Sequence, residues 1–189
     1  MRRAKLRRSS LMGVEVDVTD SFTPGDRPMV VVMGVSGCGK STVAQALAGL
    51  LGIPVADADD FHRPTNVAKM AAGLALGDED RQPWLELVGH WLAVQERGGV
   101  MACSALRRVY RDTLRRSAPS IFFVHLDGAP ETIRARLIAR PGHFMPASLL
   151  ASQLATLEPL DVEEGGLVVD VDEPVAGIVA RVVEALGRN

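Results

Sequence analysis

Eight consecutive residues, 34–41, have the types and spacing best suited to chemistry in this chain. They read Gly-Val-Ser-Gly-Cys-Gly-Lys-Ser and fit the phosphate-binding pattern G-x-x-x-x-G-K-[ST] in full. Glycines let the backbone curl so that its N–H groups point at phosphate oxygens, while Lys40 would reach the β- and γ-phosphates. The Ser41 hydroxyl would ligate Mg²⁺. The pattern predicts that a nucleoside triphosphate is held by Gly34, Val35, Ser36, Gly37, Cys38, Gly39, Lys40, Ser41 and Thr42.

Two carboxylates, Asp57 and Asp59, follow the apolar segment 53–56 and are the nearest source of metal and substrate ligands. Open α/β sheets bind ligands where their parallel strands end. Residues two apart on an extended backbone face the same way, so the two carboxylates would point together. Asp57 could hold the water shell of the metal, and Asp59 could accept a hydrogen bond and the proton of an attacking hydroxyl. The alternative is a solvated acidic turn that caps the next helix.

Cationic side chains follow these carboxylates, several of them in loops after predicted strands. Arg presents a bidentate fork to a carboxylate, so some of these side chains could clamp an anionic substrate. Each one taken singly also fits an ordinary surface charge. The group consists of His62, Arg63, Lys69, Arg81, Arg107, Arg108 and Arg111.

A second cationic segment, 134–144, ends a predicted helix and runs into a Pro-Gly turn. It carries Arg134, Arg136 and Arg140. Phosphoryl transfer needs positive charge over the γ-phosphate and exclusion of water, which a closing lid provides. We therefore expect a lid here, and the alternative is a set of cations that stabilise a helix C-terminus.

The elements that must position these residues alternate between apolar strands and amphipathic helices. A continuous apolar run such as 29–33 is typical of a strand buried on both faces. Helices are predicted over 43–51 with a stop at Gly52, from Pro83 to about Gly98, from about Pro130, and over 174–186. The predicted strands are 29–33, 53–56, 100–103, 121–126 and 167–171. This alternation predicts an α/β fold in which helices cover both faces of a parallel sheet.

Charge and length indicate one globular domain that binds no nucleic acid. The chain has 189 residues and a net charge of −2, but five of its 21 basic residues lie in the first ten positions. The rest is therefore acidic, whereas a nucleic-acid platform needs a basic face. We expect residues 1–27 to be a disordered basic tail and 28–189 a single P-loop kinase domain. No secretory signal or membrane span is recognisable, and two cysteines are too few for a disulfide framework, so a cytoplasmic protein is expected.

Other classes of P-loop protein fit the sequence less well. A GTPase would carry an N-K-x-D motif, which is absent. A motor or AAA-type ATPase would have an apolar strand that ends in paired acids, but the strand 100–103 is followed by Ser104. These absences favour a small kinase, whose carboxylates come from the end of the second strand.

The segment from about Met29 to Leu186 resembles the bacterial-type gluconate kinases, which are relatives of shikimate kinase in the nucleoside-monophosphate-kinase-like group. The phosphate loop alone is generic, but several further blocks in order are specific. They are Asp57-Ala58-Asp59 with Phe61-His62, Asn66, Lys69-Met70, Leu76, Asp78, Asp80-Arg81, Pro83-Trp84-Leu85, Cys103-Ser104-Ala105-Leu106, Tyr110-Arg111-Asp112, Arg140, Gly142-His143-Phe144, Leu157-Glu158 and Val169-Asp170. Cys38 and Pro141 are small departures from the family pattern.

The resemblance implies five parallel strands in the order 2-3-1-4-5, a mobile lid, and transfer of the γ-phosphoryl group of ATP to the terminal hydroxyl of D-gluconate. It places Asp59 at the acceptor hydroxyl, Asp57 close to Mg²⁺, Arg136 near the adenine and Arg140 over the phosphates. Relatives also suggest a homodimer. The catalytic residues so expected are Lys40, Asp59 and Arg140, and the substrate contacts are Asp59, His62, Lys69, Arg81, Ser104, Arg107 and His143.

Two other readings stay open at this point. The acceptor could be shikimate, another aldonate or a nucleoside monophosphate, because specificity depends on pocket shape to within one hydroxyl. Shikimate kinases have a Gly-Gly-Gly turn after the third strand, and this chain has Cys103-Ser104-Ala105 there. A regulator that binds nucleotide without transfer would lack the aspartate pair or the lid arginines, and this sequence has both.

Overall fold

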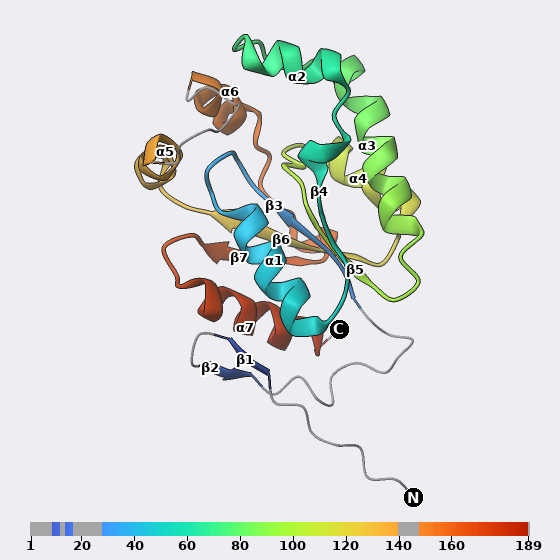
Figure 1. Cartoon of the computed structure of the whole chain (residues 1–189), viewed down its shortest axis with the longest axis vertical. Helices are drawn as coiled ribbons and strands as arrows, with labels where there is room; N and C mark the ends of the chain where they lie inside the picture. Colours follow the sequence, from blue (N-terminus) through green and yellow to red (C-terminus); the bar gives the residue numbers. More distant parts are fainter. Residues whose placement is uncertain (1–8, 12–13, 17–27, 140–147, 189) are drawn as a thin grey trace, which may run out of the picture.

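A five-stranded parallel sheet forms the centre of the protein (Figure 1). The computed structural model describes residues 9–11, 14–16, 28–139 and 148–188. The strands lie in the order β4 (Val55–Asp57), β5 (Gly99–Ala102), β3 (Met29–Met33), β6 (Ile121–Asp127) and β7 (Gly166–Asp170), and every neighbouring pair is parallel. Numbered along the sheet-forming strands this order is 2-3-1-4-5, as predicted.

The central strand β3 explains why both faces of the sheet must be covered. All five of its residues are buried, and successive side chains point to opposite faces. Val30 and Val32 join the core under α1 (Lys40–Leu51) and α7 (Val175–Leu186). Val31 and Met33 join the core under α3 (Asp78–Ala93) and α4 (Arg108–Ser117). A strand buried on both faces carries no polar alternation, which is why its sequence is a continuous apolar run.

Helix α3 begins earlier than predicted, at Asp78 rather than at Pro83. Asp78, Glu79 and Asp80 occupy its first turn, where acidic side chains interact favourably with the helix N-terminus. The Asp80 carboxylate also accepts a hydrogen bond from Gly77 N at 3.0 Å. Pro83 lies inside the helix. The proline signal was therefore misread, because the acidic capping residues upstream decide where this helix starts.

The remaining elements connect the strands, and several of them lie at the edge of the sheet where the site is found. The 3₁₀ turn η1 (Ala58–Phe61) and α2 (Pro64–Ala71) follow β4, and neither was predicted. Helix α5 (Pro130–Ala139) starts where proline indicated. Helix α6 (Ser148–Thr156) and the 3₁₀ turn η2 (Val162–Glu164) then lead to β7. In Figure 1, α2 and α6 lie on the same side of the sheet edge, above the loop between β3 and α1.

Two short strands, β1 (Ser9–Leu11) and β2 (Val14–Val16), pair antiparallel within the segment expected to be a disordered tail. The rest of that segment lies outside the described residues, and so does the expected lid at 140–147. The division into a tail and one domain remains a prediction. No helix in the described part of the chain is long and apolar enough to cross a membrane.

Candidate active site

The phosphate loop follows β3 directly and leads into α1, as its chemistry requires. Gly34 has φ of 136°, and a Cβ there would lie 2.7 Å from the Leu126 carbonyl oxygen, so only glycine fits. Gly39 has φ of 102° and caps α1. Lys40 donates from Nζ to the Val35 carbonyl at 3.0 Å. The loop is thus curled with its lysine folded over it, in a conformation that presents the N-terminus of α1 to an anion.

A first pocket lies over this loop and is polar. Ser41 Oγ donates to Asp57 Oδ2 at 2.6 Å, which joins the start of α1 to the end of β4. Hydroxyl and carboxylate oxygens are the ligands that Mg²⁺ prefers, and this ion keeps several waters instead of demanding a full protein cage. The lining residues are Ser36, Gly37, Gly39, Lys40, Ser41, Thr42, Asp57 and Asp59.

The two aspartates meet at this pocket by a different route from the one predicted. The extended backbone ends at Asp57, and Asp59 lies in the 3₁₀ turn η1. Asp57 Oδ1 accepts a hydrogen bond from Asp59 N at 3.1 Å and so caps the turn. The prediction that the two carboxylates face the same way on an extended strand is therefore wrong. Asp57 therefore caps the turn and also lines the pocket, although the sequence offered capping as the alternative to a functional role.

A second, larger cleft adjoins the first and encloses about 670 Å³, including the part open to solvent. Ser36, Lys40 and Asp59 line both. These three residues therefore lie between the pocket over the phosphate loop and a separate binding space. The other lining residues are His62, Met70, Ala75, Leu76, Arg81, Trp84, Ser104, Leu106, Ser152, Gln153 and Thr156.

His62 and Trp84 form the stacked wall of the larger cleft. Their ring centroids are 4.4 Å apart and the planes are inclined by 14°. Trp84 Nε1 donates to the Ala58 carbonyl at 2.6 Å, which holds the η1 turn that carries Asp59. Burial, with a smaller contribution from the Arg81 charge, lowers the pKa of His62 to about 4. His62 is therefore a neutral imidazole at pH 7, and its Nε2 lies 4.0 Å from an Asp59 oxygen.

Of the predicted substrate cations, Arg81 lines the larger cleft, whereas Lys69 and Arg107 do not. Arg81 donates to the Tyr110 hydroxyl at 3.1 Å. Lys69 is paired with Asp80 at 2.7 Å. Arg107 is paired with Asp78 at 2.8 Å. The two outer cations thus form ion pairs around the start of α3, leaving Arg81 as the predicted cation that faces the cleft.

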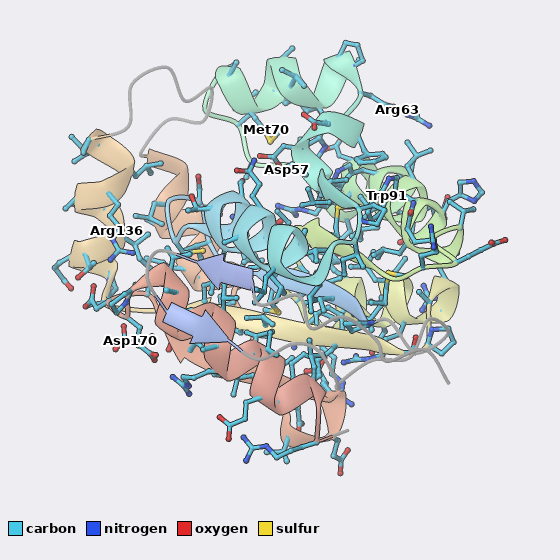
Figure 2. All side chains as sticks on the ribbon, turned by 60° about the horizontal axis from the view of Figure 1, so that its bottom comes forward. Asp57, Arg63, Met70, Trp91, Arg136 and Asp170 are labelled. Carbon is cyan, nitrogen blue, oxygen red and sulfur yellow. The ribbon has the colours of Figure 1, made fainter. Side chains whose placement is uncertain are left out.

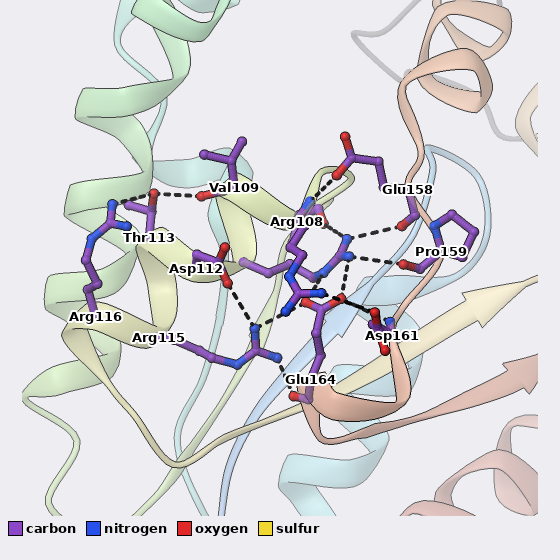
Figure 3. Close-up of polar contacts among 12 residues, drawn as sticks. Arg108, Val109, Asp112, Thr113, Arg115, Arg116, Glu158, Pro159, Asp161 and Glu164 are labelled. Atoms are coloured by element: carbon purple, nitrogen blue, oxygen red, sulfur yellow. Dashed lines mark hydrogen bonds and ion pairs between the residues drawn. The ribbon is translucent and has the colours of Figure 1, made fainter.

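A buried arginine fixes the loop that carries Ser104. Arg111 is fully buried and forms a two-pronged ion pair with Glu164, at 2.6 and 2.7 Å. Its guanidinium also donates to the carbonyls of Ala105 and Leu106, both at 3.3 Å, and to those of Glu158 and Pro159. Figure 3 shows this cluster, in which Arg115 also reaches Glu164. The cluster ties the cleft loop to the segment that follows α6.

The other predicted residues fall into four groups. Ser104 lines the larger cleft, and the side chains of Val35 and Cys38, within the phosphate loop, are buried. Arg136 lies on α5, paired with Asp172 at 3.3 Å, and Figure 2 places it across the protein from Trp91 on α3. Arg140 and His143 lie outside the described residues. The roles assigned to all of these residues remain predictions.

Sequence reasoning missed the contribution of α6. Ser36 N donates to Gln153 Oε1 at 2.6 Å, a bond between residues 117 positions apart. Ser152 and Thr156 lie on the same helix and also line the larger cleft. No local pattern in α6 resembles a binding motif, so only the fold brings these side chains to the phosphate loop.

Comparison with known proteins agrees with this geometry. A family model described as shikimate kinase matches residues 36–158. The thermoresistant gluconokinase of Escherichia coli is 41% identical over 173 residues, which cover 89% of this chain and 99% of that protein. The gluconokinase of Gluconobacter oxydans is 53% identical over 132 residues, which cover 68% of this chain and 74% of that protein.

Solved structures give the same result. A gluconokinase from Sinorhizobium meliloti has a TM-score of 0.79 and 46% identity, with 86% of this chain and 93% of that chain covered. A shikimate kinase from Acinetobacter baumannii has a TM-score of 0.58 and 20% identity over 86% of this chain and 93% of its own, a likeness of fold alone. With its parallel sheet, its phosphate loop and relatives of this similarity over most of its length, the chain belongs to the gluconokinases, within the shikimate-kinase-like P-loop kinases.

Proposed function

We propose that this protein transfers the γ-phosphoryl group of ATP to the terminal hydroxyl of D-gluconate, giving 6-phospho-D-gluconate and ADP. One observation carries the proposal: Ser36, Lys40 and Asp59 line both the phosphate pocket and the larger cleft. A donor phosphate on the loop and an acceptor in the cleft would meet at these residues. The two gluconokinases of Escherichia coli, 41% and 40% identical over 89% and 82% of this chain, support gluconate as the acceptor.

The chemistry of the cleft suits an acid with many hydroxyls. Arg81 supplies a cation for the carboxylate of the acceptor, while the remaining polar lining residues include hydroxyls and a carboxamide that hydrogen-bond to sugar hydroxyls. Asp59 would accept the proton as the acceptor oxygen bonds to the γ-phosphorus. The bond between that phosphorus and the oxygen that bridges it to the β-phosphate breaks, and ADP leaves.

Positioning and charge neutralisation provide most of the catalysis in phosphoryl transfer. Lys40 would turn from the Val35 carbonyl to the phosphates, since an ammonium group finds a stronger partner there. Ser41 and Asp57 would hold Mg²⁺, which supplies positive charge beside the β- and γ-phosphates. The backbone N–H groups of the loop and the N-terminus of α1 complete the cradle.

A coupled assay of ADP release tests the proposal. Purified protein with Mg²⁺-ATP is given gluconate and, in parallel, shikimate, other aldonates or nucleoside monophosphates. A gluconate-dependent rate far above the others supports the proposal. Turnover with another acceptor alone would replace gluconate but keep the kinase, and ATP binding without turnover on any acceptor would favour a nucleotide-binding regulator.

The cellular setting and assembly are part of the same proposal. Both cysteines, Cys38 and Cys103, are free and buried, which suits a reducing cytoplasm. We propose a homodimer, as relatives suggest. Light scattering at several protein concentrations measures the assembly, and a constant monomer mass would refute it.

A further inference from the structure

Helix α6 has two distinct faces, one packed against the core and one that lines the larger cleft. Leu150 is buried in the core, and Leu154 and Leu157 pack against it. Ser152, Gln153 and Thr156, in contrast, line the larger cleft. The helix thus anchors itself with leucines while it presents a row of neutral polar groups to the space where an acceptor would bind.

The charged side chains of the cleft come from elements other than α6. Lys40 and Asp59 lie where the cleft meets the phosphate pocket, and Arg81 is a further cation of the lining. The residues from α6 carry no charge. A hydroxyl or carboxamide side chain forms good hydrogen bonds with a neutral hydroxyl of a ligand. Such binding needs no charged side chain. The α6 groups are therefore suited to the uncharged part of an acceptor.

Gln153 also connects this wall to the phosphate loop. Its Oε1 accepts the hydrogen bond from Ser36 N at 2.6 Å. Ser36 is 5% exposed and lines both pockets. The bond fixes the carboxamide, and with it the polar face of α6, relative to the loop that would hold the donor phosphates.

We propose that the polar face of α6, formed by Ser152, Gln153 and Thr156, reads the secondary hydroxyls of the acceptor, and that Gln153 keeps this reading face in register with the phosphate loop. The inference rests on the proposed function, because it takes a polyhydroxy acid as the acceptor. It makes α6 a determinant of acceptor specificity. A site built to hydrogen-bond a hydroxyl discriminates strongly against an analogue without it, because its polar groups are then left unpaired.

The test compares gluconate with deoxygluconates that each lack one secondary hydroxyl. Thr156→Val keeps the shape of the side chain and removes its hydroxyl, which donates to the Ser152 carbonyl at 2.7 Å and would accept a hydrogen bond from the acceptor. Ser152→Ala is a second variant of the same design. Each should raise the KM for gluconate by about tenfold, since one hydrogen bond is lost, with the KM for ATP unchanged. Each should also equalise kcat/KM between gluconate and one deoxygluconate. Gln153→Ala should lower kcat as well, because the hydrogen bond from Ser36 N to Gln153 Oε1 is lost.

Ala155→Ser is the matched control, since Ala155 lies on the same helix, is exposed and does not line the cleft. It should behave as the wild type. If the wild type turns over gluconate and both Thr156→Val and Ser152→Ala keep its KM for gluconate, this inference is overturned while the proposed function stands. No turnover of gluconate by the wild type would overturn the proposed function, and the inference with it. A variant whose KM for ATP also rises has lost more than a hydroxyl contact, which would count against a role in reading the acceptor.

Discussion

Glu164→Gln removes the charge that balances the buried Arg111 while keeping the size of the side chain. Glu164 is 5% exposed, and its two oxygens accept hydrogen bonds from Arg111 at 2.6 and 2.7 Å. Arg115 donates to the same carboxylate at 3.2 Å. An amide can accept only part of this set, so the variant leaves a buried guanidinium without its counter-charge.

The pKa of Glu164 gives the size of the effect. Burial alone would raise this pKa, but hydrogen bonds from Arg111, from the Asp161 backbone and from Arg115, together with the Arg111 charge, lower it from 4.5 to about 2. At 1.36 kcal/mol per pKa unit, the ionised carboxylate adds about 3 kcal/mol to folding stability. Because the folded-state pKa is depressed, this stability is complete above pH 4.5 and is lost as the pH falls towards 2.

Thermal and urea unfolding at pH 7 measure the loss. A change of about 3 kcal/mol should lower the Tm by roughly 6–12 °C in a chain of this length. Glu184→Gln is the control, since Glu184 pairs with Arg188 at 3.2 Å on an exposed helix face and should contribute almost nothing. The gap between Glu164→Gln and the wild type should narrow below pH 4.5. Equal Tm values for the two variants, or a gap that does not depend on pH, would refute the reasoning.

Three further substitutions test the site. Lys40→Ala should lower turnover by orders of magnitude with an unchanged far-ultraviolet circular dichroism spectrum and Tm, and near-normal activity would contradict the phosphate-loop assignment. Asp59→Asn should lower kcat far more than the affinity for ATP measured by calorimetry, whereas a pure binding defect would assign Asp59 another role. Gly34→Ala should cost more than about 2 kcal/mol in urea unfolding, because its Cβ would meet the Leu126 carbonyl at 2.7 Å. Gly165→Ala, with positive φ but open space around it, should cost less.

The sheet could be predicted because its signals are local. The apolar run at Met29–Met33 and the glycine stop at Gly52 belong to single elements, and both predictions agree with the structure. The strand order came from the family resemblance and is confirmed. Helix α3 was placed too late because Pro83 was taken as its start, although proline is accommodated inside this helix. The acidic residues of the first turn, Asp78–Asp80, indicate the start of this helix better than Pro83 does.

The site was predictable only where its residues lie in one motif or directly follow a strand. Lys40, Ser41 and Asp57 fall in this class, and the structure brings them together. Gln153 does not, because its contact with Ser36 spans 117 positions and depends on how α6 packs. Lys69 was predicted to bind substrate from its charge and from the family resemblance; in the structure it is paired with Asp80, the acid that the fold brings near it, and its substrate role stays a prediction.

Among the residues that the structure describes, the two pockets share Ser36, Lys40 and Asp59, and this has a consequence for protein engineering. The donor half comes from the loop after the central strand, while most of the acceptor half comes from the connections β4–β5 and β6–β7. Residues in those connections can be substituted without disturbing the strand that holds the phosphate loop. A library confined to the cleft residues Met70, Arg81, Ser152 and Thr156 would therefore explore new acceptors, while Trp84 and Gln153 are kept because they hold the η1 turn and the phosphate loop.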